Sequence, residues 1–159
     1  WRLVMLDSVV PNRAGGRLSE AELDSLDRTL AAAGRRHALV ALHHHPVAMS
    51  SHWLDQVGLD NHAQFFEVID RHPNVRAVVW GHVHQHFDAM RGSVRLLSTP
   101  STCAQFKPGT DQFAVDTRPP GYRILELGVD GAIRTEVVWL ERSVARSRLP
   151  TPQSSSSAA

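Results

Sequence analysis

Two groups of histidines are unusual because of their spacing. The first is the run His43-His44-His45-Pro46, and the second is Gly81-His82-Val83-His84. A neutral imidazole nitrogen is a good ligand for Zn, Fe, Mn and similar ions. Two histidines separated by one residue can direct their rings toward one point when a glycine before them permits a sharp turn. The groups therefore predict a metal site, although either group alone is also compatible with ordinary histidines at a strand end.

Both groups directly follow short segments that predict buried β-strands. Residues 38–42 (ALVAL) and 75–80 (VRAVVW) are predominantly apolar runs bounded by polar residues. Such runs are typical of strands buried on both faces of a parallel sheet. In open α/β sheets, ligands gather at the carboxyl ends of the strands. We therefore expect the two histidine groups to meet at that end of the sheet.

Helices are predicted between these strands. Ser19-Glu20-Ala21-Glu22 matches a capping box, and leucines at helical spacing follow it as far as Gly34. A second helix is predicted over residues 61–71, before Pro73. With a first strand over residues 2–10, the order is strand, helix, strand, helix, strand. This order predicts a parallel sheet with helical crossovers.

The pattern changes after His84. Short strands are predicted over residues 85–90, 93–98, 122–127 and 133–140, with Asp130-Gly131 as a hairpin turn. Residues 53–55 and 99–120 are predicted as loops, and the second is unusually long. We expect one domain over residues 1–142 and a disordered tail over the low-complexity residues 143–159.

The composition restricts the class of protein. With 159 residues, of which 42% are apolar, the chain is long enough for one α/β domain. A formal net charge of +1 argues against binding of nucleic acid or of a membrane surface. No apolar run approaches the about 20 residues that a membrane span needs. The single cysteine, Cys103, excludes an internal disulfide, favours the cytoplasm and is expected to be a small packed side chain.

A histidine-proline run followed about 40 residues later by G-H-x-H resembles the last two signature blocks of the calcineurin-like metallophosphoesterases. Other stretches resemble the class III cyclic-AMP phosphodiesterases of that family, namely Leu6-Asp7-Ser8, Leu18-Ser19, Trp53-Leu54-Asp55, Pro120-Gly121 and residues 99–103 and 105–108. The resemblance implies an α/β fold that is part of a four-layer α/β/β/α sandwich. Because the chain starts at Trp1 within a predicted strand, we expect it to be the C-terminal portion of such a domain, with the N-terminal half missing.

The resemblance also implies which residues bind metal. In this family two divalent ions of the Fe, Mn or Zn type lie side by side, bridged by a carboxylate. By their places in the motifs, His43 and His82 are expected to bind one ion and His84 the other. The triple-histidine run leaves His44 as the alternative to His43. The family blocks D-x-H, G-D and G-N-H-[D/E], which supply the remaining ligands, are not identified in this chain.

The implied activity is that of a hydrolase acting on a phosphodiester, with conversion of 3',5'-cyclic AMP to AMP as the leading reaction. The expected partner is therefore a small cyclic nucleotide or other phosphodiester. His84, Asp55 and Lys107 are expected to contact it, although Asp55 is equally compatible with a solvated loop position and Lys107 is more typical of an ordinary surface lysine. Three alternatives remain: a glycerophosphodiester or other phosphoester as substrate, an inactive truncated fragment, and a module that binds a single metal. The chain alone is expected to be inactive, because three imidazoles carry no negative charge to offset two dications.

Overall fold

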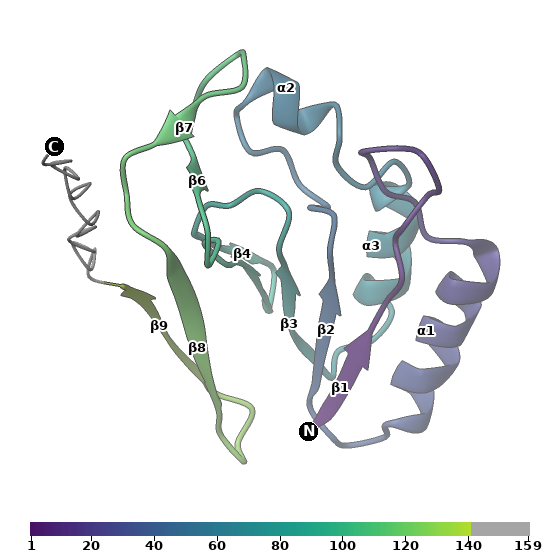
Figure 1. Ribbon diagram of the computed structural model, residues 1–159. Coiled ribbons are helices and arrows are strands. Elements are labelled where there is room, and N and C mark those ends of the chain that lie inside the picture. The colour runs from purple at the N-terminus through teal and green to yellow at the C-terminus, as the bar shows by residue number, and fades with distance from the viewer. Residues whose placement is uncertain (141–159) are drawn as a thin grey trace, which may run out of the picture.

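The computed structural model describes residues 1–140, and its centre is a five-stranded sheet in the order β1-β2-β3-β5-β4 (Figure 1). Four of the strands are parallel and β4 is antiparallel to β5. The strands are β1 (Arg2–Met5), β2 (Ala38–Leu42), β3 (Val75–Trp80), β4 (Phe87–Arg91) and β5 (Val94–Ser98). The predicted α/β class, with a parallel sheet and helical crossovers, is confirmed.

The central strands form where the apolar runs predicted them. Val40 of β2 and Val78 of β3 are fully buried, because layers cover both faces of the sheet at its centre. The first strand is shorter than predicted, since it ends at Met5 and not at Val10. After Leu6 donates its backbone N–H to Ala41, the chain leaves the sheet. The side chain of Asp7 then accepts a hydrogen bond from the backbone of Val9, which turns the segment away.

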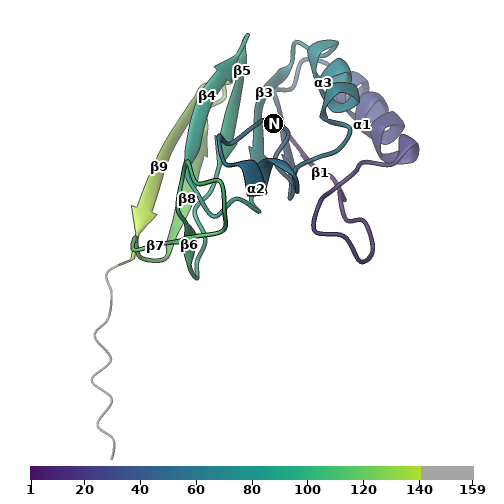
Figure 2. The same cartoon turned by 90° about the horizontal axis from the view of Figure 1, so that it is seen from above.

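Two helices cover one face of the sheet (Figure 2). Helix α1 (Glu20–Ala32) begins as predicted, because the Ser19 hydroxyl accepts a hydrogen bond from the Glu22 N–H at 3.1 Å. Helix α3 (His62–Asp70) lies within the predicted range. The two helices bury apolar side chains against the sheet, including Leu26, Leu30, Phe65 and Ile69.

Two segments that were predicted as loops contain short elements. Residues 53–55 belong to helix α2 (His52–Asp55), which is a single turn and too short to leave a periodic pattern in the sequence. The predicted loop 99–120 contains β6 (Gln105–Phe106) paired with β7 (Val115–Asp116). The buried Gln105 side chain holds this region together, because its amide bonds the backbone N–H and C=O of Ser101.

A second sheet covers the other face of the first. Strands β8 (Gly121–Leu127) and β9 (Ile133–Trp139) form an antiparallel hairpin on the side away from α1 and α3 (Figure 2). Arg123 connects the two sheets, since its guanidinium donates to the backbone oxygens of Ser98 and Phe87 at 2.8 and 3.1 Å. The described residues thus form three layers, helices, sheet and sheet, in the order that the predicted four-layer sandwich requires.

Two predictions concern the ends of the chain and its membrane relationship. The predicted domain boundary at residue 142 and the predicted tail over residues 143–159 lie outside the described residues. Among residues 1–140, no helix has the length and apolar character needed to cross a membrane.

Candidate metal centre

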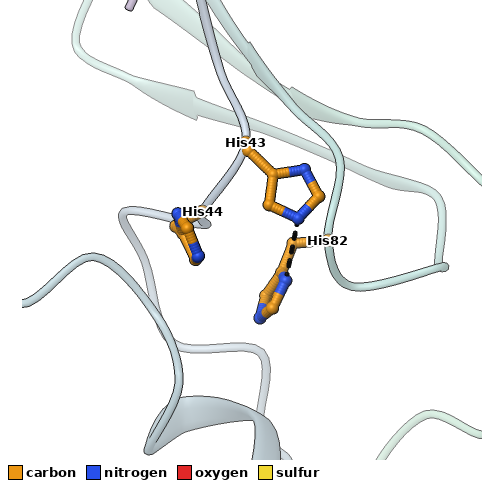
Figure 3. A group of neighbouring side chains, drawn as sticks. All are labelled: His43, His44 and His82. Carbon is orange, nitrogen blue, oxygen red and sulfur yellow. Dashed lines mark hydrogen bonds between the residues drawn. The ribbon is translucent and has the colours of Figure 1, made fainter. Parts of the chain in front are cut away.

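Three imidazole rings converge at the carboxyl ends of β2 and β3. His43, His44 and His82 each offer one nitrogen, and these nitrogens lie within 4.8 Å of one another (Figure 3). Both strands end level with each other, because Leu42 is the register partner of Trp80. The register therefore delivers both histidine groups to the same point of the sheet edge, as the sequence predicted.

The closest pair of nitrogens has the spacing of a chelate. His82 Nδ1 lies 3.1 Å from His43 Nε2. Two nitrogens bound to one ion at about 2.0–2.1 Å are roughly 2.8–3.4 Å apart, from octahedral to tetrahedral geometry. The imidazoles therefore need little rearrangement to accept a divalent ion.

A strained backbone turn directs the second histidine group inward. His82 and His84 both have positive φ angles, 62° and 49°, in the left-handed region that side chains with a Cβ rarely adopt. Such residues cost of order 1–3 kcal/mol each and cluster at functional sites. The turn is therefore a backbone outlier at the place where the metal ligands are predicted.

His44 is buried and is oriented by Ser8. The Ser8 hydroxyl lies 2.8 Å from His44 Nδ1, and both residues are almost fully buried. Gly16 makes room for the ring, because a Cβ at that position would come within 2.1 Å of His44 Nδ1. A histidine held at one nitrogen presents the other in a fixed direction, which is the usual arrangement of a metal-binding histidine. The sequence singled out Leu6-Asp7-Ser8 only as a matching stretch, so this role of Ser8 was missed.

The electrostatics keep the three rings neutral. Burial lowers the pKa of His82 to about 3, and the neighbouring imidazoles reinforce the shift. Burial is also the main cause that lowers the pKa of His43 and of His44 below their ordinary values. At neutral pH, all three rings therefore keep a lone pair for a metal ion, as ligation by histidine requires.

His45 lies beside this group, although no role was predicted for it. Its side chain is only 2% exposed, and its ring stacks on His82 with centroids 5.6 Å apart. Within the described part of the chain, neither of its ring nitrogens has a hydrogen-bond partner. The nearest carboxylate oxygen, on Asp55, is 4.0 Å from Nε2. His45 also lines a hollow of about 470 Å³ between α2 and α3.

His84 is not part of the three-histidine group. Its Nδ1 donates a hydrogen bond to the Ala104 carbonyl at 2.8 Å, and its ring stacks on Phe106 with centroids 4.1 Å apart. This hydrogen bond fixes the tautomer, so that Nε2 carries the lone pair. His84 is thus able to bind a metal ion, and its assignment to a second ion stays a prediction.

The two other predicted substrate contacts have different surroundings. The Asp55 carboxylate accepts a hydrogen bond from the backbone N–H of Met49 at 2.7 Å, so one of its oxygens stabilises the loop after β2. Lys107 follows β6 and is exposed, and its backbone N–H donates to Ala114. Their contacts with substrate stay predictions.

Two strings in the sequence have the form D-x-H. Asp70-Arg71-His72 ends α3, and its Asp70 and His72 contact Arg91 and Asp27. The other string is Asp60-Asn61-His62. It lies at the start of α3 and not at the end of a strand. The Asn61 side chain bonds both backbone groups of Leu18, and Asp60 forms an ion pair with Arg13 at 3.3 Å. These contacts give the string a structural role, and it does not join the three-histidine group.

The prediction that Cys103 is packed was wrong, since this residue is exposed.

Several curated proteins are similar to this chain in sequence. No protein-family profile matches it. The 3',5'-cyclic adenosine monophosphate phosphodiesterase CpdA of Pseudomonas aeruginosa is 46% identical over 137 residues, which are 86% of this chain and 50% of the relative. The protein of the same name from Escherichia coli K12 has the same identity and coverage. A 3',5'-cyclic-nucleotide phosphodiesterase of Nostoc is 40% identical over 86% of this chain and 52% of its own length. The chain thus spans about half the length of these relatives.

Two solved structures share the fold. A dimetal phosphatase from Danio rerio matches with a TM-score of 0.52 and 19% identity, over 78% of this chain and 39% of that protein. The Plasmodium protein GAP50, described as the anchor in the inner membrane complex, matches with a TM-score of 0.62 and 16% identity, over 86% of this chain and 44% of its own. At these identities the likeness concerns the fold alone.

Proposed function

Since the chain belongs to the calcineurin-like metallophosphoesterases and has cyclic-AMP phosphodiesterases as relatives over half their length, we propose that its protein hydrolyses a phosphodiester with divalent metal ions. The observation that carries the proposal is the convergence of His43, His44 and His82 at the carboxyl ends of two parallel strands. Neutral rings, a chelating N–N distance of 3.1 Å and a buried hydrogen bond to one ring all fit an ion of the Fe, Mn or Zn type.

The residues have separate tasks in this proposal. His82 and His44 hold one ion, because His82 comes from the strained turn and His44 is fixed by Ser8. The more exposed His43 completes the group from the rim. His84 offers Nε2 to a second ion or to a phosphoryl oxygen. When bound, divalent ions lower the pKa of a water molecule and neutralise the charge of the phosphoryl group.

Cyclic AMP is the substrate we propose, because the relatives from Pseudomonas aeruginosa and Escherichia coli carry the name of that activity. The product is AMP, formed when water is added across one P–O ester bond. The partner is thus a small molecule, and we place the reaction in the cytoplasm. Lys107 and Asp55 lie on the segments beside the histidines and are proposed to contact the nucleotide.

A full dinuclear site needs negative charge that these histidines do not supply. Among the described residues, the group of three contains imidazoles and no carboxylate. Two dications held only by neutral ligands repel each other, so at least one bridging carboxylate is required. We propose that it comes from the part of the domain that the relatives have beyond the half matched here.

A module that binds a single metal is the second candidate. The observation that favours it is that the three nitrogens within 4.8 Å form one group, while His84 lies outside it. Such a module would bind one ion to the chain alone and would not cleave phosphodiesters. The number of metal ions bound by the 159-residue chain does not by itself distinguish this module from a phosphodiesterase, so a test of activity is also needed.

A chimeric enzyme supplies that test. The 137-residue segment of the Pseudomonas aeruginosa relative that aligns with this chain is replaced by the matching residues of this chain. The chimera is expected to hydrolyse cyclic AMP with manganese, and His82→Ala is expected to abolish turnover. His52→Ala, at an exposed histidine of α2, is the control and is expected to retain it. A folded chimera that leaves cyclic AMP intact would refute the phosphodiesterase proposal.

A further inference from the structure

Three aromatic rings form a cluster near the histidines. Trp53 comes from α2, Phe106 from β6, and Phe113 from the turn between β6 and β7. Their ring centroids are 5.2 to 5.3 Å apart in all three pairs, with interplanar angles of 71°, 81° and 72°. This edge-to-face arrangement is the favourable one for aromatic pairs, so the rings hold each other in fixed orientations.

The aromatic cluster reaches His84, which lies beside the candidate metal centre in the sequence. The ring of His84 lies flat on Phe106, with an interplanar angle of 12° and centroids 4.1 Å apart. His84 is separated by one residue from His82, which belongs to the metal centre. A path of ring contacts therefore leads from His84 through Phe106 to Phe113.

Phe113 is open to solvent although it is firmly held. Trp53 and Phe106 pack against the hydrophobic core, but Phe113 is 59% exposed. Its neighbour Val115 is 56% exposed. An exposed aromatic ring leaves apolar area in contact with water, at a cost of roughly 25 cal/mol per Å². A flat ligand that covers the ring would recover this free energy without reordering the loop.

We propose that Phe113, supported by Trp53 and Phe106, is the surface on which the nucleobase of the substrate stacks. The inference rests on the proposed function, because it requires the phosphate of the same nucleotide to lie at the histidines. Every nucleobase has a planar π-face, and stacking on aromatic side chains is a common way to bind it. This surface would select nucleotides over phosphodiesters without an aromatic group, such as glycerophosphodiesters.

Binding to the 159-residue chain tests the proposal without requiring turnover. Titration calorimetry in the presence of manganese compares AMP with ribose 5-phosphate, which has the same phosphate and sugar but no base. AMP is expected to bind more tightly, and Phe113→Ala is expected to weaken the binding of AMP by about 5- to 150-fold. Binding of ribose 5-phosphate is expected to stay unchanged in this variant.

Two further variants separate stacking from a general effect on the loop. Phe113→Tyr keeps the ring and is expected to bind AMP as the unmodified chain does. Val115→Ala shortens a neighbouring exposed side chain of β7 and is expected to leave both ligands unaffected. The inference is overturned if AMP and ribose 5-phosphate bind equally, or if Phe113→Ala weakens both to the same extent.

These outcomes differ from a failure of the proposed function. If AMP binding depends on Phe113 while the chimera does not cleave cyclic AMP, the base-stacking surface is supported and the proposal of phosphodiester hydrolysis is refuted. If the chimera cleaves cyclic AMP and Phe113→Ala leaves its KM unchanged, the proposal of hydrolysis is supported and the proposal of a stacking surface is refuted.

Discussion

The hydroxyl of Ser8 and the Nδ1 atom of His44 lie 2.8 Å apart, although 36 residues separate them in the sequence. The contact exists because β1 and β2 are adjacent and parallel, so that the segments following them leave the sheet at the same edge. It is buried, which makes its hydrogen bond more directional and its loss more costly than at the surface. The Ser8–His44 contact is therefore the most specific structural support of the candidate metal centre.

Removal of the Ser8 hydroxyl is expected to weaken metal binding. Ser8→Ala leaves His44 Nδ1 without its partner, and loss of such an outer contact typically costs 10- to 100-fold in metal affinity. Competition with a chromophoric chelator measures this affinity for zinc. Ser93→Ala, in the exposed turn between β4 and β5, is the matched control. Equal affinities for Ser8→Ala and the unmodified chain would show that Ser8 has no role in the site.

Two single variants can show whether His43 or His44 is the stronger metal ligand. His44→Ala is expected to reduce zinc affinity more than His43→Ala, because His44 is buried and oriented while His43 is exposed. His82→Ala is expected to cause the largest loss. The same competition measurement ranks the three. A larger effect of His43→Ala would instead support His43 as the ligand, as the sequence motif predicts.

The metal-free chain is expected to lose stability as the pH falls below about 6.5. Burial lowers the pKa of His45 to about 4, with Asp55 acting in the opposite direction. Because the ordinary value is 6.5, the unfolded chain binds the proton first, and the free energy of unfolding is greatest above that pH. Between pH 6.5 and 4, the buried His45 contributes a loss of up to roughly 1.4 kcal/mol per pH unit.

Urea denaturation in EDTA at several pH values measures this dependence. His45→Gln is expected to make the pH profile less steep, because the glutamine does not titrate, while the contribution of His82, whose pKa burial also lowers, remains. His52→Gln, at an exposed position of α2, is expected to keep the slope of the unmodified chain. A profile for His45→Gln that is as steep as the control's would show that other groups cause the dependence.

A methyl group at Gly16 is expected to displace His44. Its Cβ would lie within 2.1 Å of His44 Nδ1, so the ring must move. Overpacking of this kind typically costs 1–3 kcal/mol, and zinc affinity should fall together with stability. Gly15→Ala is the matched control, because its Cβ would have no neighbour nearer than 3.5 Å. Thermal unfolding and chelator competition measure both effects, and equal results for the two variants would contradict this account.

The positions of the histidine groups could be predicted because they depend on strand ends. Apolar runs located β2 and β3, and parallel register then brought the residues after Leu42 and Trp80 together. The choice between His43 and His44 could not be made from sequence. Side chains alternate reliably only within a strand, and both residues follow the last one of β2.

Other features escaped prediction because they depend on distant contacts. Ser8 acquires its role only when β1 lies beside β2. The strands β6 and β7 lie in a segment whose ends are joined by the buried Gln105 amide, which bonds Ser101 and Pro119. The aromatic cluster joins α2 with the β6–β7 turn, two segments that had been predicted as loops.

The position of β1 at the border of the five-stranded sheet affects how the chain behaves in concentrated solution. In residues 1–140, β1 pairs with β2 on one side, and its other backbone edge has no strand partner. Leu3 and Met5 on this strand are 59% and 80% exposed. An open edge with apolar side chains is a template for intermolecular strand pairing. Aggregation of the isolated chain is therefore expected to begin at β1, and a lysine at Leu3 or Met5 should improve its colloidal stability.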